Sequence, residues 1–148
     1  MPYNGETPKV ASLGGSETAA WAIARELVRL GHSVVAFTNG KPGEFDGVSY
    51  QNMGRVTPES PLGENFYLYA EHTPNDAVIV QRHPLAFQRP ICSKVNLWWT
   101  HDLALRRTQQ LVGSMLWNVD KVVTVSEWHR QQLAKIYRVP LDGVVAIR

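Results

Sequence analysis

The apolar residues of the chain fall into two kinds of segment. From Ser16 to Leu30 they recur at helical spacing, Ser16 can serve as the N-cap, and Gly31 follows where a helix would end. Elsewhere they form short continuous runs, each long enough for one strand, at Val34–Phe37, Ala77–Val80, Val95–Trp99, Val122–Val125 and Val144–Ile147. Continuous apolar runs are typical of parallel strands that are buried on both faces. The pattern therefore predicts a helix followed by a series of buried strands.

Helical patterns also follow three of the later strands. We expect a short helix near Leu85, a longer one from Leu103 to Trp117, and a third from Glu127 to Tyr137 that Ser126 caps. Strands that alternate with helices at this spacing predict a mainly parallel sheet with helices on both faces and right-handed crossovers. The expected fold is thus a Rossmann-like α/β fold.

Two stretches interrupt this alternation. Residues 39–61 are rich in Gly, Pro and polar side chains, with one expected strand at Val48–Met53. The segment before Gly15 reads as a loop, although a Gly-Gly loop that opens a helix normally follows a first strand. We therefore expect that residues 1–148 form a single domain that begins just after its first strand. The unpaired strand edges that would result favour homo-oligomerisation.

Composition and charge exclude several classes of function. The 148 residues, 44% of them hydrophobic, suit one globular domain, and a net charge of +2 with scattered Lys and Arg gives no support for nucleic-acid binding. The single cysteine, Cys92, permits neither an intrachain disulfide nor a Cys-x-x-Cys zinc site. No signal peptide and no apolar run of membrane-spanning length is evident. We expect a cytoplasmic protein without a transmembrane segment.

Candidate chemistry lies just after the strands, because ligands of open parallel sheets bind beyond the carboxyl ends of the strands. Four groups of residues occupy such positions: Gly14-Gly15-Ser16-Glu17 at the first helix, Arg82-His83, His101-Asp102, and Ser126-Glu127. If the topology is as expected, Gly14, His101 and Ser126 lie at one edge of the sheet.

Each of these groups has a structural interpretation beside the functional one. Gly14 and Gly15 allow unusual backbone angles and close approach of an anion to the helix start, or they form only a turn. His101 suits proton transfer or hydrogen bonding to a sugar hydroxyl, while Asp102 can cap the next helix. Arg82 can hold an anion or remain a solvated surface residue.

Three further residues have a structural explanation. Ser126 fits a helix cap better than a nucleophile, since no Gly-x-Ser-x-Gly elbow surrounds it. Trp98 and Trp99 alternate across a strand and are explained by core packing.

Two other classes of protein fit the same residues poorly. A dinucleotide-binding domain would need Gly-x-Gly-x-x-Gly and an acidic residue at the end of the second strand, which here runs into Thr38-Asn39. A metallohydrolase would need clustered ligands such as His-Glu-x-x-His, which are absent from the sequence. We therefore expect neither a bound metal nor NAD as cofactor.

Three ordered motifs resemble a known family. The stretch LGGSETAAWAIARELVRLGHSVVAFT from Leu13 is similar to the opening of glycosyltransferase family 4 enzymes, with a Gly-Gly-x-Glu loop and a helix that ends in Leu-x-x-x-Gly-His. WTHDL from Trp99 and VDKVVTVSEWHRQQL from Val119 resemble two later landmarks of the same N-terminal domain. Together they cover nearly the whole chain.

The resemblance implies a fold and a site. Members of the family have two Rossmann-like domains, the GT-B fold, use nucleotide-sugar donors without a metal ion and retain the anomeric configuration. Carried over by position, Gly14 and Gly15 would lie near the donor diphosphate and the acceptor. His101 would contact the donor sugar close to the reacting carbon, with Asp102 holding the local structure. We take His101 as the candidate catalytic residue, and the candidate substrate-binding residues are Gly14, Gly15, Glu17, Arg82, Asp102 and Ser126.

The function expected from the resemblance is that of an acceptor-binding domain. The full enzyme would transfer a sugar from a nucleotide-sugar to a hydroxyl-bearing acceptor, and this chain, without the C-terminal donor-binding domain, would be inactive alone. The alternative is a stand-alone α/β ligand-binding or interaction module that has kept the fold and lost the chemistry.

Overall fold

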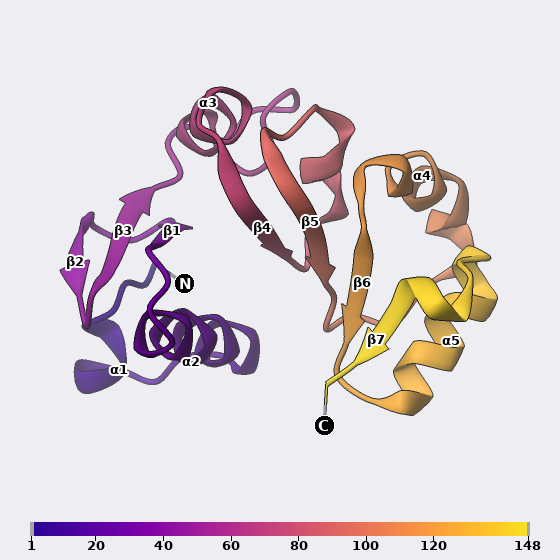
Figure 1. Ribbon diagram of the computed structural model, residues 1–148, viewed down its shortest axis with the longest axis horizontal. Helices are drawn as coiled ribbons and strands as arrows, with labels where there is room; N and C mark the ends of the chain where they lie inside the picture. Colours follow the sequence, from indigo (N-terminus) through magenta and orange to yellow (C-terminus); the bar gives the residue numbers. More distant parts are fainter. Residues whose placement is uncertain (1, 148) are drawn as a thin grey trace. The chain divides into compact units, whose positions relative to one another are not determined.

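Helices and strands alternate along most of the chain in the computed structural model, which describes residues 2–147 (Figure 1). The α-helices are α1 (Thr7–Val10), α2 (Gly15–Arg29), α3 (Glu64–His72), α4 (Gln109–Gly113) and α5 (Glu127–Tyr137). Short 3-10 helices are η1 (Pro84–Gln88), η2 (Arg106–Thr108), η3 (Leu116–Asn118) and η4 (Leu141–Gly143). The strands are β1 (Val34–Thr38), β2 (Gly43–Phe45), β3 (Val48–Asn52), β4 (Asn75–Gln81), β5 (Ser93–Trp99), β6 (Lys121–Thr124) and β7 (Val144–Ala146).

The chain divides into two compact units. The first contains the chain up to Pro58 together with Gly63–Phe66, and the second contains Glu59–Leu62 together with the chain from Tyr67 onward. Each unit has a sheet of its own, with three strands in the first and four in the second. The expected strands are therefore present, but they belong to two sheets instead of one.

The first unit is built on the strand order β1-β3-β2. Strands β1 and β3 are parallel, with Val34 opposite Val48, and β2 adds an antiparallel strand that the sequence did not predict. Helix α2 packs on this sheet through Ala24, which is buried together with Val48 and Tyr50. Apolar spacing along α2 thus produces a small core between one helix and one sheet.

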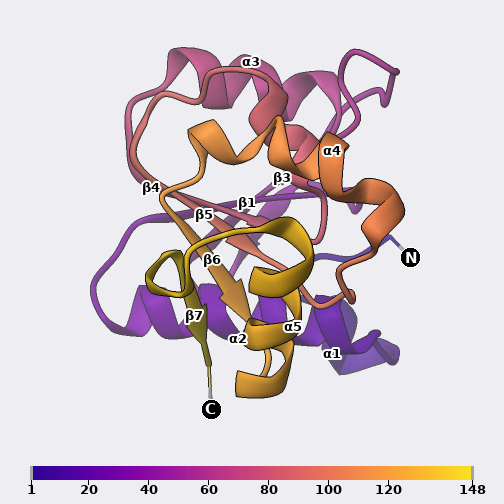
Figure 2. The same cartoon turned by 90° about the vertical axis from the view of Figure 1, so that its right-hand side faces the viewer.

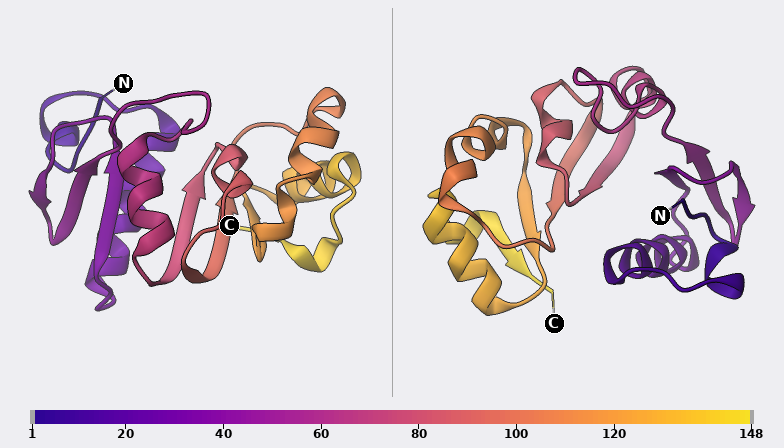
Figure 3. Two further views of the ribbon diagram at one scale, coloured as in Figure 1. Left: turned by 90° about the horizontal axis from the view of Figure 1, so that it is seen from above. Right: turned by 180° about the vertical axis from the view of Figure 1, so that it is seen from behind.

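The second unit confirms the α/β fold class. Its strand order is β4-β5-β6-β7, every neighbouring pair is parallel, and helices flank the sheet (Figures 1 and 3). Helix α5 lies beside β6 and β7 (Figure 2). The largest fully buried apolar side chains of this unit are Tyr67, Phe87, Met115, Leu133, Val122 and Val144, and the polar residues His129, Thr100 and Thr124 are fully buried as well. An all-parallel sheet with flanking helices is the Rossmann-like arrangement that the alternation predicted.

Strand burial falls short of the expectation in several strands, and Val95 of β5 and Val145 of β7 are 39% and 48% exposed. Strand β1 is mostly half-buried, and in β4 the side chain of Ile79 is 37% exposed. Both are edge strands in their sheets, so each has a neighbouring strand on one side only. Continuous apolar character therefore predicted the strands but overestimated their burial.

The prediction of one long helix from Leu103 to Trp117 is wrong. Residues 103–105 form a loop, and the helical part is divided among η2, α4 and η3. The loop is held by long-range hydrogen bonds, because the Gln132 amide accepts from the Ala104 N–H at 3.1 Å and donates to the Ala104 carbonyl at 2.8 Å. The second of these bonds occupies the Ala104 carbonyl, which a helix beginning at Leu103 would use as an acceptor.

Helix α3 was not predicted by the apolar spacing. It buries Tyr67 and Ala70, and its sequence mixes aromatic with charged residues. Among the residues that the structure describes, no helix combines the length and the apolar character needed to cross a membrane.

Candidate functional site

The second unit brings the carboxyl ends of β4, β5 and β6 to one edge of its sheet. Gln81 ends β4 and pairs in register with Trp99 at the end of β5, which pairs in turn with Val123 of β6. The residues that follow these strands are Arg82, His101, Asp102 and Ser126. Four of the seven predicted site residues therefore lie at the same edge of one unit.

Arg82 and Asp102 form a two-pronged ion pair. Arg82 donates from Nε to Oδ2 and from Nη2 to Oδ1 of Asp102, each at 2.9 Å. The backbone of Arg82 is left-handed, with φ of 66°, and its N–H donates to the Trp99 carbonyl at 2.9 Å while its own carbonyl accepts from Trp98 Nε1 at 3.3 Å. A non-glycine residue adopts this conformation at a cost, and here contacts to the next strand hold it. The guanidinium is thereby aimed at the loop after β5.

The expectation that Asp102 caps a helix is wrong. No helix begins directly after it, since the next one is η2 at Arg106, and both carboxylate oxygens accept from the Arg82 guanidinium. The local sequence suggested a cap because an acidic residue precedes an apolar stretch. A residue that lies 20 positions away in the sequence binds the carboxylate instead.

His101 is held by contacts on two sides. Its Nε2 atom lies 2.9 Å from the amide nitrogen of Gln81, and its ring lies 4.8 Å from the Trp99 ring, centroid to centroid. Trp99 itself is buried, as core packing predicted. The imidazole is half-buried and keeps part of its surface open to solvent.

The surroundings shift the pKa of both His101 and Asp102. Burial lowers the pKa of His101 below its usual 6.5, and the positive charge of Arg82 lowers it further. The hydrogen bonds from Arg82 lower the pKa of the Asp102 carboxyl below 3.8, in spite of partial desolvation. At neutral pH the site therefore presents a neutral imidazole beside a compensated ion pair.

His129 connects helix α5 to the same loop. Its N–H donates to Ser126 Oγ at 3.1 Å, which confirms Ser126 as the N-cap of α5. Its Nε2 lies 3.0 Å from the Asp102 carbonyl, which also accepts from Thr100 Oγ1 at 3.2 Å. Because a carbonyl only accepts, His129 carries its proton on Nε2. Its buried Nδ1 has no hydrogen-bond partner among residues 2–147.

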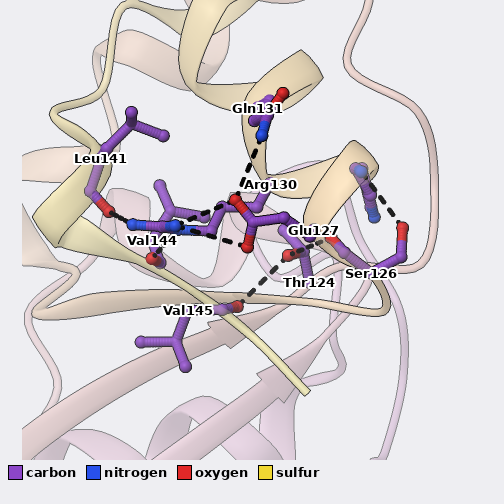
Figure 4. Close-up of polar contacts among 9 residues, drawn as sticks. Thr124, Ser126, Glu127, Arg130, Gln131, Leu141, Val144 and Val145 are labelled. Carbon is purple, nitrogen blue, oxygen red and sulfur yellow. Dashed lines mark hydrogen bonds and ion pairs between the residues drawn. The ribbon is translucent and has the colours of Figure 1, made fainter. Parts of the chain in front are cut away.

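Hydrogen bonds also connect the first turns of α5 to β7 (Figure 4). Arg130 donates from Nε to the Val144 carbonyl and from Nη2 to the Leu141 carbonyl, each at 2.7 Å, and its Nη1 lies 3.0 Å from Glu127 Oε1. The helix start, and with it Ser126 and His129, is therefore fixed by side chains as well as by packing.

The other three predicted site residues, Gly14, Gly15 and Glu17, lie in the first unit. Gly14 is the N-cap of α2 with φ of −66°, and Gly15 begins the helix, so neither uses a left-handed backbone. A Cβ at Gly14 would lie 2.5 Å from Glu17 Oε2, whereas one at Gly15 would meet nothing within 4 Å. The unusual angles that glycine allows are not needed here, and Gly15 instead leaves open space at the helix start.

The expected cap at Ser16 is also wrong. Helix α2 begins one residue earlier, at Gly15, and no side chain caps it. The Ser16 hydroxyl donates to Glu17 Oε2 at 2.9 Å.

Two residues of this edge were missed from the sequence. Gln81 directly precedes Arg82, and the rule that selected strand ends could have included it. His129 lies three residues after Ser126 and looked like an ordinary helix residue. No group of three or more potential metal ligands occurs within the described part of the chain.

Removing the positive charge of Arg82 should raise the pKa of both His101 and Asp102. In Arg82→Ala, Asp102 loses its hydrogen bonds and the His101 imidazolium loses a repulsive charge, so we expect both pKa values to rise. NMR titration of the Asp102 carboxyl and the His101 ring would measure both, with the exposed Arg107→Ala as control.

The same pair contributes to stability only over part of the pH range. The pKa of Asp102 is lower in the folded state than in the unfolded state. The ion pair therefore stabilises the fold at pH values above the unfolded-state pKa, and this stabilisation is lost as the pH falls through the folded-state pKa. The pair is more than one-third exposed, so this contribution is small. An Asp102 carboxyl that titrated identically in the unchanged chain and in Arg82→Ala would contradict the assignment.

The fold and the polar edge together define a class of protein. A parallel sheet with flanking helices, and with its polar side chains gathered at the carboxyl ends of its strands, is a Rossmann-like α/β domain with a candidate ligand site at that edge. The sequence model of Glycosyltransferase Family 4 matches residues 13–148, and the chain belongs to this family. A search of curated proteins gave no match. Membership assigns a glycosyltransferase-type function to the domain.

Proposed function

We propose that this chain is the acceptor-binding, N-terminal domain of a retaining glycosyltransferase. The complete enzyme would transfer a sugar from a nucleotide-sugar donor to a hydroxyl-bearing acceptor. Family membership supports this proposal, and the observation that carries it is the cluster of Gln81, Arg82, His101 and Asp102 at the sheet edge. A half-buried imidazole held at a strand end suits hydrogen bonding to a polar ligand.

His101 is the residue that we place at the reacting centre. Its lowered pKa keeps the ring neutral at physiological pH, so it meets a sugar oxygen as a hydrogen-bonding group without adding charge. The ion pair between Arg82 and Asp102 and the bond from His129 to the Asp102 carbonyl fix the loop that bears it. A small displacement of a positioned catalytic group can lower the reaction rate by a large factor. The contacts that fix this loop would therefore serve to hold His101 in place.

The remaining residues have supporting roles in the proposal. Gly14, Gly15 and Glu17 would lie near the donor diphosphate and the acceptor, where the open space at Gly15 permits close approach. Arg82 and Ser126 would bind substrate at the strand ends of the second unit. Catalysis would rest on positioning and on stabilising the charge of the leaving diphosphate.

The leaving diphosphate needs cationic groups that a second, donor-binding domain would supply. In the second unit the Arg82 guanidinium is held by the Asp102 carboxylate, and Arg130 is held by α5 and β7. We therefore expect the 148-residue chain alone to bind ligands without turnover.

A direct assay tests this proposal. Release of nucleoside diphosphate from nucleotide-sugar donors should be undetectable with the chain alone and should appear when the chain is joined to a family 4 donor-binding domain. Heat-unfolded chain joined to the same domain is the matched control. If the folded, joined protein bound an acceptor but released no nucleoside diphosphate from any donor, the chain would instead be the stand-alone binding module.

A further inference from the structure

The contact between Gln81 and His101 carries information about where the imidazole proton lies. Gln81 is the last residue of β4, and its Cα partner in the sheet is Trp99, two residues before His101. Its side-chain nitrogen, Nε2, lies 2.9 Å from Nε2 of His101. An amide nitrogen donates and does not accept, so the imidazole Nε2 must be the acceptor.

We propose that Gln81 is a positioning residue that holds His101 as the Nδ1–H tautomer, so that the ring serves as a hydrogen-bond donor and not as a general base. The role of the ring in sugar transfer rests on the proposed function. The tautomer itself rests only on contacts within this chain.

The alternative orienting group, Asp102, is already engaged. In a histidine–aspartate pair the carboxylate would accept an imidazole N–H and leave the other ring nitrogen as a base. Here both carboxylate oxygens accept from Arg82, at 2.9 Å each. Asp102, the neighbour of His101 in sequence, therefore binds the Arg82 side chain. Gln81, on the adjacent strand, orients His101.

Most of the charged and titratable groups around His101 favour the neutral form of its ring. Arg82 after β4 and His129 on α5 both disfavour a second proton on the ring, while Asp102 favours one. Burial disfavours it most of all, so the pKa of His101 lies below 6.5. A doubly protonated ring would also set its Nε2–H against the Gln81 donor.

The other ring nitrogen of His101 is the one left for a ligand. Nδ1 has no hydrogen-bond partner among residues 2–147. In the Nδ1–H tautomer it can donate to an oxygen of a bound substrate, whether a sugar hydroxyl or a phosphate oxygen. It has no lone pair with which to take a proton from an acceptor hydroxyl, since the only lone pair of the neutral ring faces Gln81.

NMR on the chain labelled with nitrogen-15 in histidine tests the assignment directly. The two ring nitrogens resonate differently according to which bears the proton, and long-range proton–nitrogen correlations identify them. At pH 7 the unchanged chain should show His101 with a protonated Nδ1 and an unprotonated Nε2, the tautomer that free neutral histidine disfavours. His129 should show the opposite tautomer in the same spectrum and serves as an internal reference.

Substitutions of Gln81 give the matched comparison. Gln81→Ala should return His101 to mainly Nε2–H, because no donor then faces Nε2. Gln81→Glu should move the proton to Nε2 and raise the pKa of His101, because a carboxylate accepts from that atom and stabilises the cation. Gln110→Glu makes the same charge change at an exposed position of α4 and should alter neither property.

Two results would overturn the inference. One is an Nε2–H tautomer for His101 in the unchanged chain, a measurement that needs no variant to fold. The other is an unchanged Nδ1–H tautomer in a folded Gln81→Ala. If the spectra agree but His101 proves dispensable for sugar transfer, the tautomer assignment stands and the proposed role of His101 at the reacting centre fails, so the two failures are distinguishable.

Discussion

His101→Ala should lower kcat/KM for sugar transfer by about 10²–10³, or roughly 3–4 kcal/mol, in the enzyme formed with the donor-binding domain. The expected loss is that of one positioned hydrogen-bond donor beside the reacting carbon. Stability should change little, because the half-buried ring has one side-chain hydrogen bond, to Gln81. Initial rates of nucleoside diphosphate release at several acceptor concentrations would separate kcat from KM.

A matched control for this variant is His32→Ala. His32 is an exposed histidine after α2 and should leave the rate unchanged. If a folded His101→Ala enzyme stayed within about twofold of the original rate, His101 would have a structural role only.

Phe87→Ala should give the largest loss of stability, about 3–5 kcal/mol for the second unit. Phe87 lies on η1, directly after the corner that contains Gln81 and Arg82, and its side chain is fully buried at 0% exposure. Truncation removes buried apolar surface and leaves a cavity in a close-packed core. Since domains are stable by only about 5–15 kcal/mol, this change should lower the urea midpoint markedly.

Tryptophan fluorescence during urea unfolding would measure the effect, since Trp98 and Trp99 are buried in this unit. Leu111→Ala removes an apolar side chain that is 49% exposed and should cost much less. A Phe87→Ala loss no larger than that of Leu111→Ala would show that η1 does not pack as described.

Local sequence signals predicted the parts of the fold that depend on neighbouring residues. The bounds of α5 are confirmed as Glu127–Tyr137, and so is the Ser126 cap, because helical spacing and capping act within one turn. The later strands are also confirmed, since a short apolar run favours a strand, although some of their apolar side chains are exposed. The order of those strands is not encoded locally, so the edge positions of β1 and β4 were not predicted.

The candidate site shows the same division between local and distant effects. The strand-end rule selected Arg82, His101, Asp102 and Ser126, which the second unit brings to one edge. It could not predict the partners, because the Arg82–Asp102 pair spans 20 positions and the His129–Asp102 contact spans 27. The interpretation of Asp102 as a cap failed because of the first of these contacts.

The place of His101 in the reaction is tested most directly by a crystal structure of the joined enzyme with a non-reactive nucleotide-sugar analogue. We expect Nδ1 of His101 within hydrogen-bond distance, about 2.6–3.2 Å, of an oxygen of the donor sugar or its leaving phosphate. The Nε2 atom should remain on the Gln81 amide, as in the chain described here. A donor sugar bound away from the strand ends of the second unit, with no contact to His101, would contradict the proposed function.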